Sequence, residues 1–257
     1  MSSILFEIKN HVAIITLNRP EKLNSFNREM ALAMQKALDD CNSKEVRAVY
    51  ITGAGKGFCA GQDLAEVTAD DAPGFKQILS EHYNPIVLRL RNLARPVVAA
   101  VNGVAAGAGA NLALCCDIVV ATESASFIQA FSKIGLVPDT AGTYFLPRLI
   151  GAQKAAALMM LGEKVSATDA EKMGMIYKVL PDADFTAASF QLAETLAQMP
   201  TKALAFIKHM LTETDEHSLE EQLEMEDEFQ QKAAATKDYA EGVSAFMQKR
   251  SPKFTGE

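Results

Sequence analysis

The stretch VVAAVNGVAAGAGANLALCCDIVVA, residues 97–121, decides the fold of this chain. Its two ends, 97–101 and 118–121, are short runs of β-branched and small apolar residues. Unbroken apolar runs of this length are typical of strands buried on both faces of a parallel sheet. The glycine-rich segment between them leads into helix-forming residues that end near Cys116. The stretch therefore predicts a buried strand–loop–helix–strand unit.

The same stretch is the most apolar part of the chain, so a membrane helix is the alternative interpretation. A spanning helix needs about 18 or more apolar residues with few polar ones. Here Asn102, Asn111 and Asp117 interrupt the run, and glycines punctuate it. Residues 1–10 lack the basic region and long apolar run of a signal peptide. We expect neither a membrane segment nor a secretory leader.

Outward from this unit, strands and helices alternate. Runs at 5–9 and 12–18 predict a hairpin that turns at Asn10–His11, and 46–52 predicts a further strand. Residues 27–41 carry apolar side chains at helical spacing. This alternation predicts βαβ units and a largely parallel sheet. Past residue 151 the pattern predicts mainly helices, at 154–161, 168–173, 187–199, 202–212, 219–237 and 238–249.

Composition narrows the function classes. The 257 residues carry 25 basic and 32 acidic side chains, a net charge of −7 that disfavours non-specific nucleic-acid binding. The four cysteines lack metal-ligand spacing and the four histidines form no cluster, so we expect no metal site. So few cysteines in a chain of this length are typical of a reducing compartment, and we expect the cytoplasm.

Two glycine-rich elements each follow a predicted strand: 58–64, FCAGQDL, and 102–111, NGVAAGAGAN. Neither matches a phosphate-binding loop or a dinucleotide fingerprint. Taken alone, they favour tight turns in which glycine supplies unusual dihedral angles. The functional alternative is that small residues let a ligand approach the backbone. Two N–H groups, one of them at a helix N-terminus near Gly107, could then converge on one oxygen as an oxyanion hole.

Five stretches in fixed order give the chain its resemblance to a known family: 17–27 LNRPEKLNSFN, 58–64, 97–121, 131–151 FSKIGLVPDTAGTYFLPRLIG and 173–182 MGMIYKVLPD. Together they resemble the crotonase (enoyl-CoA hydratase/isomerase) superfamily over nearly the whole chain. The resemblance implies an α/β fold, a spiral of ββα units over 1–195. It also implies a C-terminal helical trimerisation segment over 196–257, in a homotrimer or a dimer of trimers.

The resemblance also implies an acyl-CoA substrate, with no separate cofactor because coenzyme A is part of the substrate. The backbone N–H groups of Gln62 and Ala108 would hold the thioester oxygen. Phe246 and Lys249 would reach the coenzyme A of an adjacent subunit. The remaining coenzyme A contacts implied by the family fall on Lys22, Leu23, Ala60, Gly61, Gln62, Asp63 and Leu64.

The acid/base residue distinguishes reactions within this superfamily. The resembled hydratases use two glutamates, at positions where this chain has Asn111 and Phe131. Neither side chain can exchange a proton at neutral pH. Asp139, after Pro138, stands where isomerases of the superfamily carry their single carboxylate. A purely structural alternative exists for each residue. Asp139 could be the N-cap of a helix over 140–149, Asn111 an ordinary polar residue of a helix, and Phe131 an ordinary core residue.

These motifs favour an isomerase. Residues 127–151 and 58–67 most resemble isomerases that convert ring-1,2-epoxidised phenylacetyl-CoA to oxepin-CoA in phenylacetate catabolism. A Δ3,Δ2-enoyl-CoA isomerase of fatty-acid oxidation is the alternative; a hydratase and a non-catalytic acyl-CoA- or RNA-binding protein are less favoured. Glu81 and His82 correspond to the segment that lies over the acyl pocket in related enzymes, but we expect their side chains to be solvated at the surface. We expect Cys59 to be a small buried residue and not a nucleophile.

Overall fold

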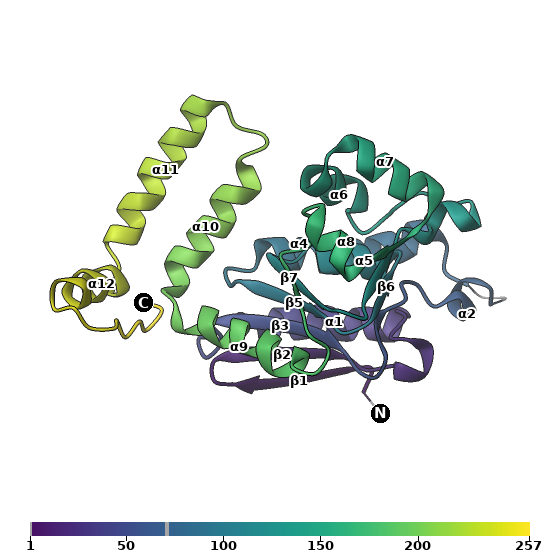
Figure 1. Ribbon diagram of the computed structural model, residues 1–257, viewed down its shortest axis with the longest axis horizontal. Coiled ribbons are helices and arrows are strands. Elements are labelled where there is room, and N and C mark those ends of the chain that lie inside the picture. The colour runs from purple at the N-terminus through teal and green to yellow at the C-terminus, as the bar shows by residue number, and fades with distance from the viewer. Residues whose placement is uncertain (1, 70–71) are drawn as a thin grey trace.

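The computed structural model describes residues 2–69 and 72–257, and its centre is a six-stranded sheet (Figure 1). The strand order is β1-β2-β3-β5-β7-β10. β1 and β2 form the predicted antiparallel hairpin, and the other neighbours pair in parallel. The bounds are Ile4–Lys9 (β1), Val12–Leu17 (β2), Ala48–Gly53 (β3), Val97–Val101 (β5), Ile118–Thr122 (β7) and Lys178–Leu180 (β10). The predicted parallel sheet is confirmed.

A second, smaller sheet runs in the order β4-β6-β8-β9, with Gly57–Cys59 (β4), Val104–Ala106 (β6), Ser126–Ile128 (β8) and Lys164–Ser166 (β9). β4, β6 and β8 pair in parallel. The chain therefore places one strand in the large sheet and the next in the small sheet, three times in succession, with helical segments after each pair. This repetition is the spiral of ββα units that the family resemblance implied, where the strand pattern alone predicted βαβ units.

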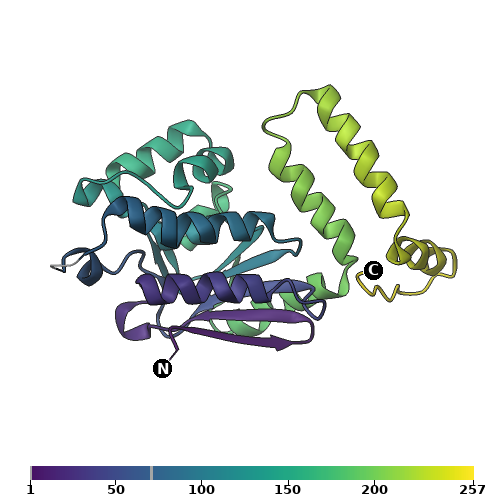
Figure 2. The ribbon, with the colours of Figure 1, turned by 180° about the vertical axis from the view of Figure 1, so that it is seen from behind.

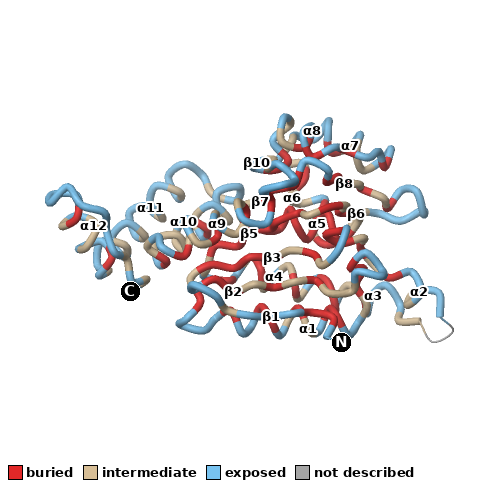
Figure 3. Tube along the Cα trace, turned by 60° about the horizontal axis from the view of Figure 1, so that its bottom comes forward, coloured by how far each residue is buried: buried red, intermediate tan, exposed pale blue. Residues whose placement is uncertain are grey.

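Helices bury the large sheet on both faces. α1 (Arg28–Asp40) and α4 (Asn84–Asn92) cover one face, as the purple and blue helices of Figure 2 show. Met30, Met34 and Leu38, on one stripe of α1, are fully buried. α9 (Phe185–Gln198) covers part of the other face. The central strands are consequently buried along most of their length, as the red segments of Figure 3 show.

Shorter elements surround the small sheet and its connections. α5 (Ala108–Leu114), α6 (Gly142–Ile150), α7 (Ala152–Leu161) and α8 (Ala167–Lys172) pack beside it. The other bounds are Pro20–Lys22 (η1), Leu64–Val67 (α2), Phe75–Gln77 (α3), the π-helical Ile78–Tyr83 (η2) and Ala130–Ile134 (η3). Within the described residues, no helix has both the length and the apolar character needed to cross a membrane.

The last three helices form an arm that extends away from the sheets (Figure 1). Its members are α10 (Thr201–Glu213), α11 (Leu219–Ala234) and α12 (Lys237–Met247). Lys208 anchors α10 to the core: its buried Nζ lies 2.9 Å from Asp117 and donates to the carbonyl of Leu90 at 2.7 Å. Apolar side chains remain exposed along the arm, among them Leu211, Leu223, Val243 and Phe246.

Candidate active site

Backbone hydrogen bonds join the loop after β4 to the earlier segment 23–26. The N–H of Ala60 donates to Leu23, that of Phe26 to Gly61 at 2.7 Å, and that of Asp63 back to Phe26 at 2.8 Å. The N–H of Gln62 lies between these bonds, and no hydrogen bond links it to any described residue. The loop therefore presents one unused donor on its free side.

The first turn of α5 supplies a second donor. Gly107, with φ 52°, ends β6 and donates to Ile128 at 2.8 Å, which leaves Ala108 as the first helical residue. A first-turn N–H has no acceptor within its own helix. That of Ala108 also has no acceptor elsewhere in the described chain.

Gly61 brings the two donors together. A Cβ added at Gly61 would lie 3.4 Å from the nitrogen of Ala108 and 2.9 Å from the carbonyl oxygen of Ala106. The loop after β4 and the start of α5 thus touch at a residue that must lack a side chain. The backbone of Gly61, next to Gln62, therefore lies against that of Ala108, and the N–H groups of Gln62 and Ala108 both lack a hydrogen-bond partner in the described chain.

Asp139 lies in the loop between η3 and α6. Its carboxylate is partly buried and accepts a hydrogen bond from the Thr140 hydroxyl at 2.8 Å. Burial raises the pKa of this carboxyl above its ordinary value, and the Thr140 bond opposes the rise. No cation forms an ion pair with it within residues 2–69 and 72–257. A carboxylate in such surroundings is a stronger base than a solvated one.

The alternative interpretation of Asp139 as a helix cap is wrong. α6 begins at Gly142, two residues later than predicted, and its N-cap position is Ala141 with φ 57° and no side-chain cap. Asp139 instead uses its backbone carbonyl, which accepts from the N–H of Gly142 at 2.9 Å. The carboxylate is therefore released from capping.

The two positions at which the resembled hydratases have glutamate are both built into the core. Asn111 is fully buried in α5; it donates to the carbonyl of Asp139 at 2.8 Å and accepts from Gln129 at 2.8 Å. Phe131 is buried in η3, with its ring edge near the Cβ position of Gly107. Asp139 is thus the ionisable group among these three residues.

A polar group that sequence reasoning missed lies on the other side of Gln62. The hydroxyl of buried Tyr83 donates to Gln62 Oε1 at 2.9 Å, and Gln62 Nε2 donates to Glu66 at 2.7 Å. Burial is the main cause of the raised pKa of Tyr83, and the neighbouring charge of Asp139 adds to it. Tyr83 belongs to a π-helical turn, which local sequence patterns do not predict; such turns are frequent at functional sites.

The expected solvation of His82 is wrong, whereas that of Glu81 agrees with the structure. The imidazole of His82 is fully buried, and neither ring nitrogen has a hydrogen-bond partner in the described chain. Burial lowers its pKa. Glu81 remains half-exposed beside Arg28.

The residues expected to bind coenzyme A fall into two separate places. Lys22, Leu23 and Leu64 are exposed next to the loop after β4, and Asp63 caps α2 while accepting from Arg19 at 2.8 Å. Phe246, 82 % exposed, belongs to α12, and Lys249 follows that helix by two residues. α12 is at the far end of the arm, on the opposite side of the molecule from α2 (Figure 1). One chain does not bring the two places together.

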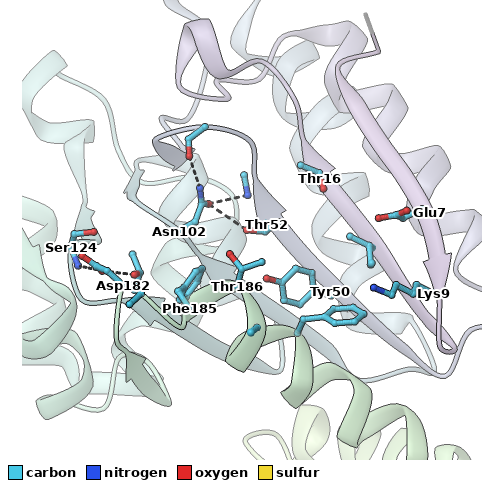
Figure 4. Close-up of a pocket in the computed structure, with 17 residues that line it drawn as sticks. Glu7, Lys9, Thr16, Tyr50, Thr52, Asn102, Ser124, Asp182, Phe185 and Thr186 are labelled. Carbon is cyan, nitrogen blue, oxygen red and sulfur yellow. Dashed lines mark hydrogen bonds between the residues drawn. The ribbon is translucent and has the colours of Figure 1, made fainter.

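Other candidate groups lie outside this region. A hollow of about 900 Å³ opens on the outer face of the large sheet, lined in part by Tyr50, Asn102 and Asp182 (Figure 4). It contains none of the predicted catalytic residues. Cys59 is fully buried and burial raises the pKa of its thiol to about 12, which excludes a ready nucleophile. No cluster with metal-ligating composition occurs within the described residues.

Comparison with known proteins gives full-length matches. Residues 7–257 match the family model described as enoyl-CoA hydratase/isomerase. The chain is 46% identical to a 1,2-epoxyphenylacetyl-CoA isomerase of Escherichia coli, with 100% of both sequences covered. It is 41% identical to a probable enoyl-CoA hydratase of Rhodobacter capsulatus, with 99% and 98% covered.

Solved structures agree with the sequence matches. A putative enoyl-CoA hydratase/isomerase from Mycobacterium abscessus superimposes with a TM-score of 0.94 at 37% identity, over 99% of this chain and 100% of that one. An enoyl-CoA hydratase from Bacillus anthracis gives a TM-score of 0.95 at 33% identity, over 99% and 100%.

Proposed function

The chain belongs to the enoyl-CoA hydratase/isomerase family, and from this premise we propose that it is an acyl-CoA isomerase with Asp139 as its acid/base. One observation carries the proposal. Two unused backbone N–H groups, at Gln62 and Ala108, meet beside a loop that presents one carboxylate, while Asn111 and Phe131 occupy the positions of the hydratase glutamates.

The geometry suits proton transfer next to a thioester. Removal of the α-proton from an acyl-CoA gives an enolate whose negative charge lies largely on the thioester oxygen. The donors at Gln62 and Ala108 stabilise that charge as it develops. Asp139 takes the α-proton from a 3-enoyl-CoA and returns a proton at the γ-carbon, which yields the 2-enoyl-CoA without any external reactant.

The physiological substrate we propose is a ring 1,2-epoxide of phenylacetyl-CoA, converted to oxepin-CoA, with the 3-enoyl to 2-enoyl shift as a related activity. The printed name of the Escherichia coli relative supports this substrate. The Streptococcus mutans relative, 37% identical over 99% of this chain and 98% of its own, is a trans-2-decenoyl-[acyl-carrier-protein] isomerase. A Δ3,Δ2-enoyl-CoA isomerase of fatty-acid oxidation, which would use the same base and oxyanion donors, is the second candidate.

Coenzyme A would lie along the exposed residues beside the loop after β4. There the ammonium group of Lys22 would bind a phosphate group of coenzyme A, and the backbone of 60–64 would line one side of the site. Phe246 and Lys249 would complete the site of a neighbouring subunit in a homotrimer or a dimer of trimers. The distance of the arm from the oxyanion loop of its own chain supports this arrangement (Figure 1).

A panel of acyl-CoA substrates tests the proposal: ring-epoxidised phenylacetyl-CoA, a 3-enoyl-CoA and a 2-enoyl-CoA, with products identified by mass and absorbance. Asp139→Asn should lower the isomerisation kcat by about 10²–10⁴, the usual contribution of general acid–base catalysis. Asp184→Asn, an exposed aspartate that caps no helix with its side chain, is the control and should match the wild type.

Two results would remove the proposal. One is hydration of the 2-enoyl-CoA at a rate comparable to isomerisation, because Asn111 and Phe131 cannot supply the second carboxylate. The other is retention of most isomerase activity by Asp139→Asn with every substrate of the panel.

A further inference from the structure

We propose that Asn111 is a positioning residue that fixes the distance between the base Asp139 and the oxyanion donor Ala108. The inference rests on the proposed isomerase function and extends it to a residue that touches no substrate. Asn111 and Ala108 lie on the same helix, three residues apart. At a rise of about 1.5 Å per residue, they are separated by less than one helical turn along α5.

The hydrogen bonds of Asn111 have only one possible direction. The carbonyl of Asp139 can only accept, so the Asn111 amide nitrogen must face it, at 2.8 Å. Asn111 Oδ1 is then left to accept, and Gln129 Nε2 donates to it at 2.8 Å. This orientation leaves Gln129 Oε1 buried without a partner in the described chain. An unsatisfied buried oxygen costs free energy, and the chain tolerates it while keeping Asn111 oriented.

Packing holds the loop against the same side chain. A Cβ at Gly142 would lie 2.3 Å from Asn111 Nδ2 and 2.6 Å from its Cγ, so the start of α6 rests directly on the amide. Thr140 and Ala141, between the base and that glycine, both have positive φ, at 50° and 57°. Such dihedral angles are strained for residues with a side chain and persist only where the surroundings enforce them.

These contacts make Asn111 the closer of two side-chain links between the Asp139 loop and α5, the other being the weaker bond from Cys115 Sγ to the carbonyl of Thr140 at 3.5 Å. The N–H of Gly142 also binds the Asp139 carbonyl, but Gly142 is only three residues further along the same segment, at the start of α6. Asn111 is the side chain that ties that carbonyl to α5. Its loss should let the carboxylate move relative to Ala108 while the coenzyme A contacts stay in place. The rate of the chemical step should then fall more than substrate binding.

The test uses Asn111→Leu, which keeps the branched shape without the amide, and Asn111→Ala, which avoids strain against Gly142. Either variant should lower the isomerisation kcat by about 10-fold to 10²-fold, the order associated with a 1 Å misplacement, while KM changes by less than threefold. The acid limb of the kcat/KM profile should move to lower pH, because a released loop exposes Asp139 and lowers its raised pKa.

Ser189→Ala is the matched control. It removes one buried hydrogen bond, to the Tyr50 hydroxyl, on the opposite face of the sheet, and should leave kcat and the pH profile unchanged. Hydrogen–deuterium exchange of the peptide spanning 139–145 supplies a readout without substrate. The Asn111 variants should exchange at least tenfold faster there than the wild type, and Ser189→Ala should not.

The outcomes separate the two proposals. If the wild type isomerises no acyl-CoA, the proposed function is wrong. Hydrogen–deuterium exchange of the peptide spanning 139–145 then shows by itself whether Asn111 holds the loop. A wild type that isomerises, with folded Asn111 variants that match it in kcat, pH profile and exchange, overturns the positioning role.

Discussion

Gly109 provides a direct test of whether the oxyanion donors depend on close contact between α5 and β4. A Cβ at this position would lie 2.3 Å from the carbonyl oxygen of Cys59 and 2.7 Å from its Sγ, whereas ordinary contact begins at 3.4 Å. In Gly109→Ala the start of α5 must therefore move by about 1 Å, the difference between 3.4 and 2.3 Å. Ala108, the neighbouring residue, has to move with it.

The expected effect is on the chemical step. A displacement of about 1 Å in a catalytic group lowers a rate by roughly 10²-fold, and complete loss of one oxyanion donor by about 10²–10³. We predict that Gly109→Ala lowers the isomerisation kcat by about 10² to 10³, with a smaller change in KM. The net loss of stability should be about 0–2 kcal/mol, since overpacking costs about 1–3 kcal/mol and alanine in a helix regains about 1 kcal/mol.

The assay is steady-state isomerisation of a 3-enoyl-CoA, with urea denaturation to confirm that each variant is folded. Gly74→Ala is the control, because a Cβ there meets no atom within 4 Å in the described chain and its φ is −66°. A folded Gly109→Ala enzyme with kcat within threefold of the wild type would refute the reasoning, since the donor at Ala108 would then tolerate the movement.

Asp139, Lys208 and the exposed end of the arm each provide a further prediction. Burial raises the pKa of Asp139 above the ~3.9 of an unfolded aspartate. The ionised carboxylate should therefore lower the stability of the wild type above about pH 4. Asp139→Asn should be more stable than the wild type at pH 7 and equal to it at about pH 3. Equal melting curves at both pH values would contradict this. Lys208→Met should lower the free energy of unfolding in urea by about 1.5–3 kcal/mol, because it removes one of the two cations paired with the partly buried Asp117 and the donor to the carbonyl of Leu90; a loss below about 0.5 kcal/mol would argue against the anchor. Phe246→Ser and Lys249→Ala should weaken both self-association and coenzyme A affinity with the monomer still folded, as ultracentrifugation and calorimetry would show; an unchanged oligomer with unchanged affinity would exclude a role for these residues between subunits.

The sequence predicted the framework well because its signals are local. Apolar runs such as 97–101 and helical spacing such as that of 27–41 depend only on neighbours in the chain, and both elements form within a residue or two of the expected bounds. The boundary of α6 was missed for a physical reason. Thr140 and Ala141 take positive φ, which neither residue favours by itself, because the side chain of Asn111, from another helix, contacts Asp139 before them and Gly142 after them.

The burial of His82 and the position of Tyr83 were equally out of reach of the sequence. Both belong to a π-helical turn, and a single extra residue in a turn rotates every later side chain relative to a regular helix. A pattern of apolar spacing cannot reveal such a rotation. Tyr83 meets Gln62 only because α1, the π turn and the loop after β4 pack together, which is a property of the tertiary fold.

The arrangement of the site follows from the repeat itself. Gln62 comes shortly after β4, Ala108 shortly after β6, and Asp139 in the segment after β8. β4, β6 and β8 are parallel neighbours in the small sheet, so their carboxyl ends meet at one edge, where ligands of parallel strands commonly bind. Each ββα unit thus contributes one residue to the proposed site. Backbone donors depend on turn geometry and leave side chains free to vary. A substitution such as glutamate to Asn111 can therefore change the reaction while the strands that position the substrate remain as they are.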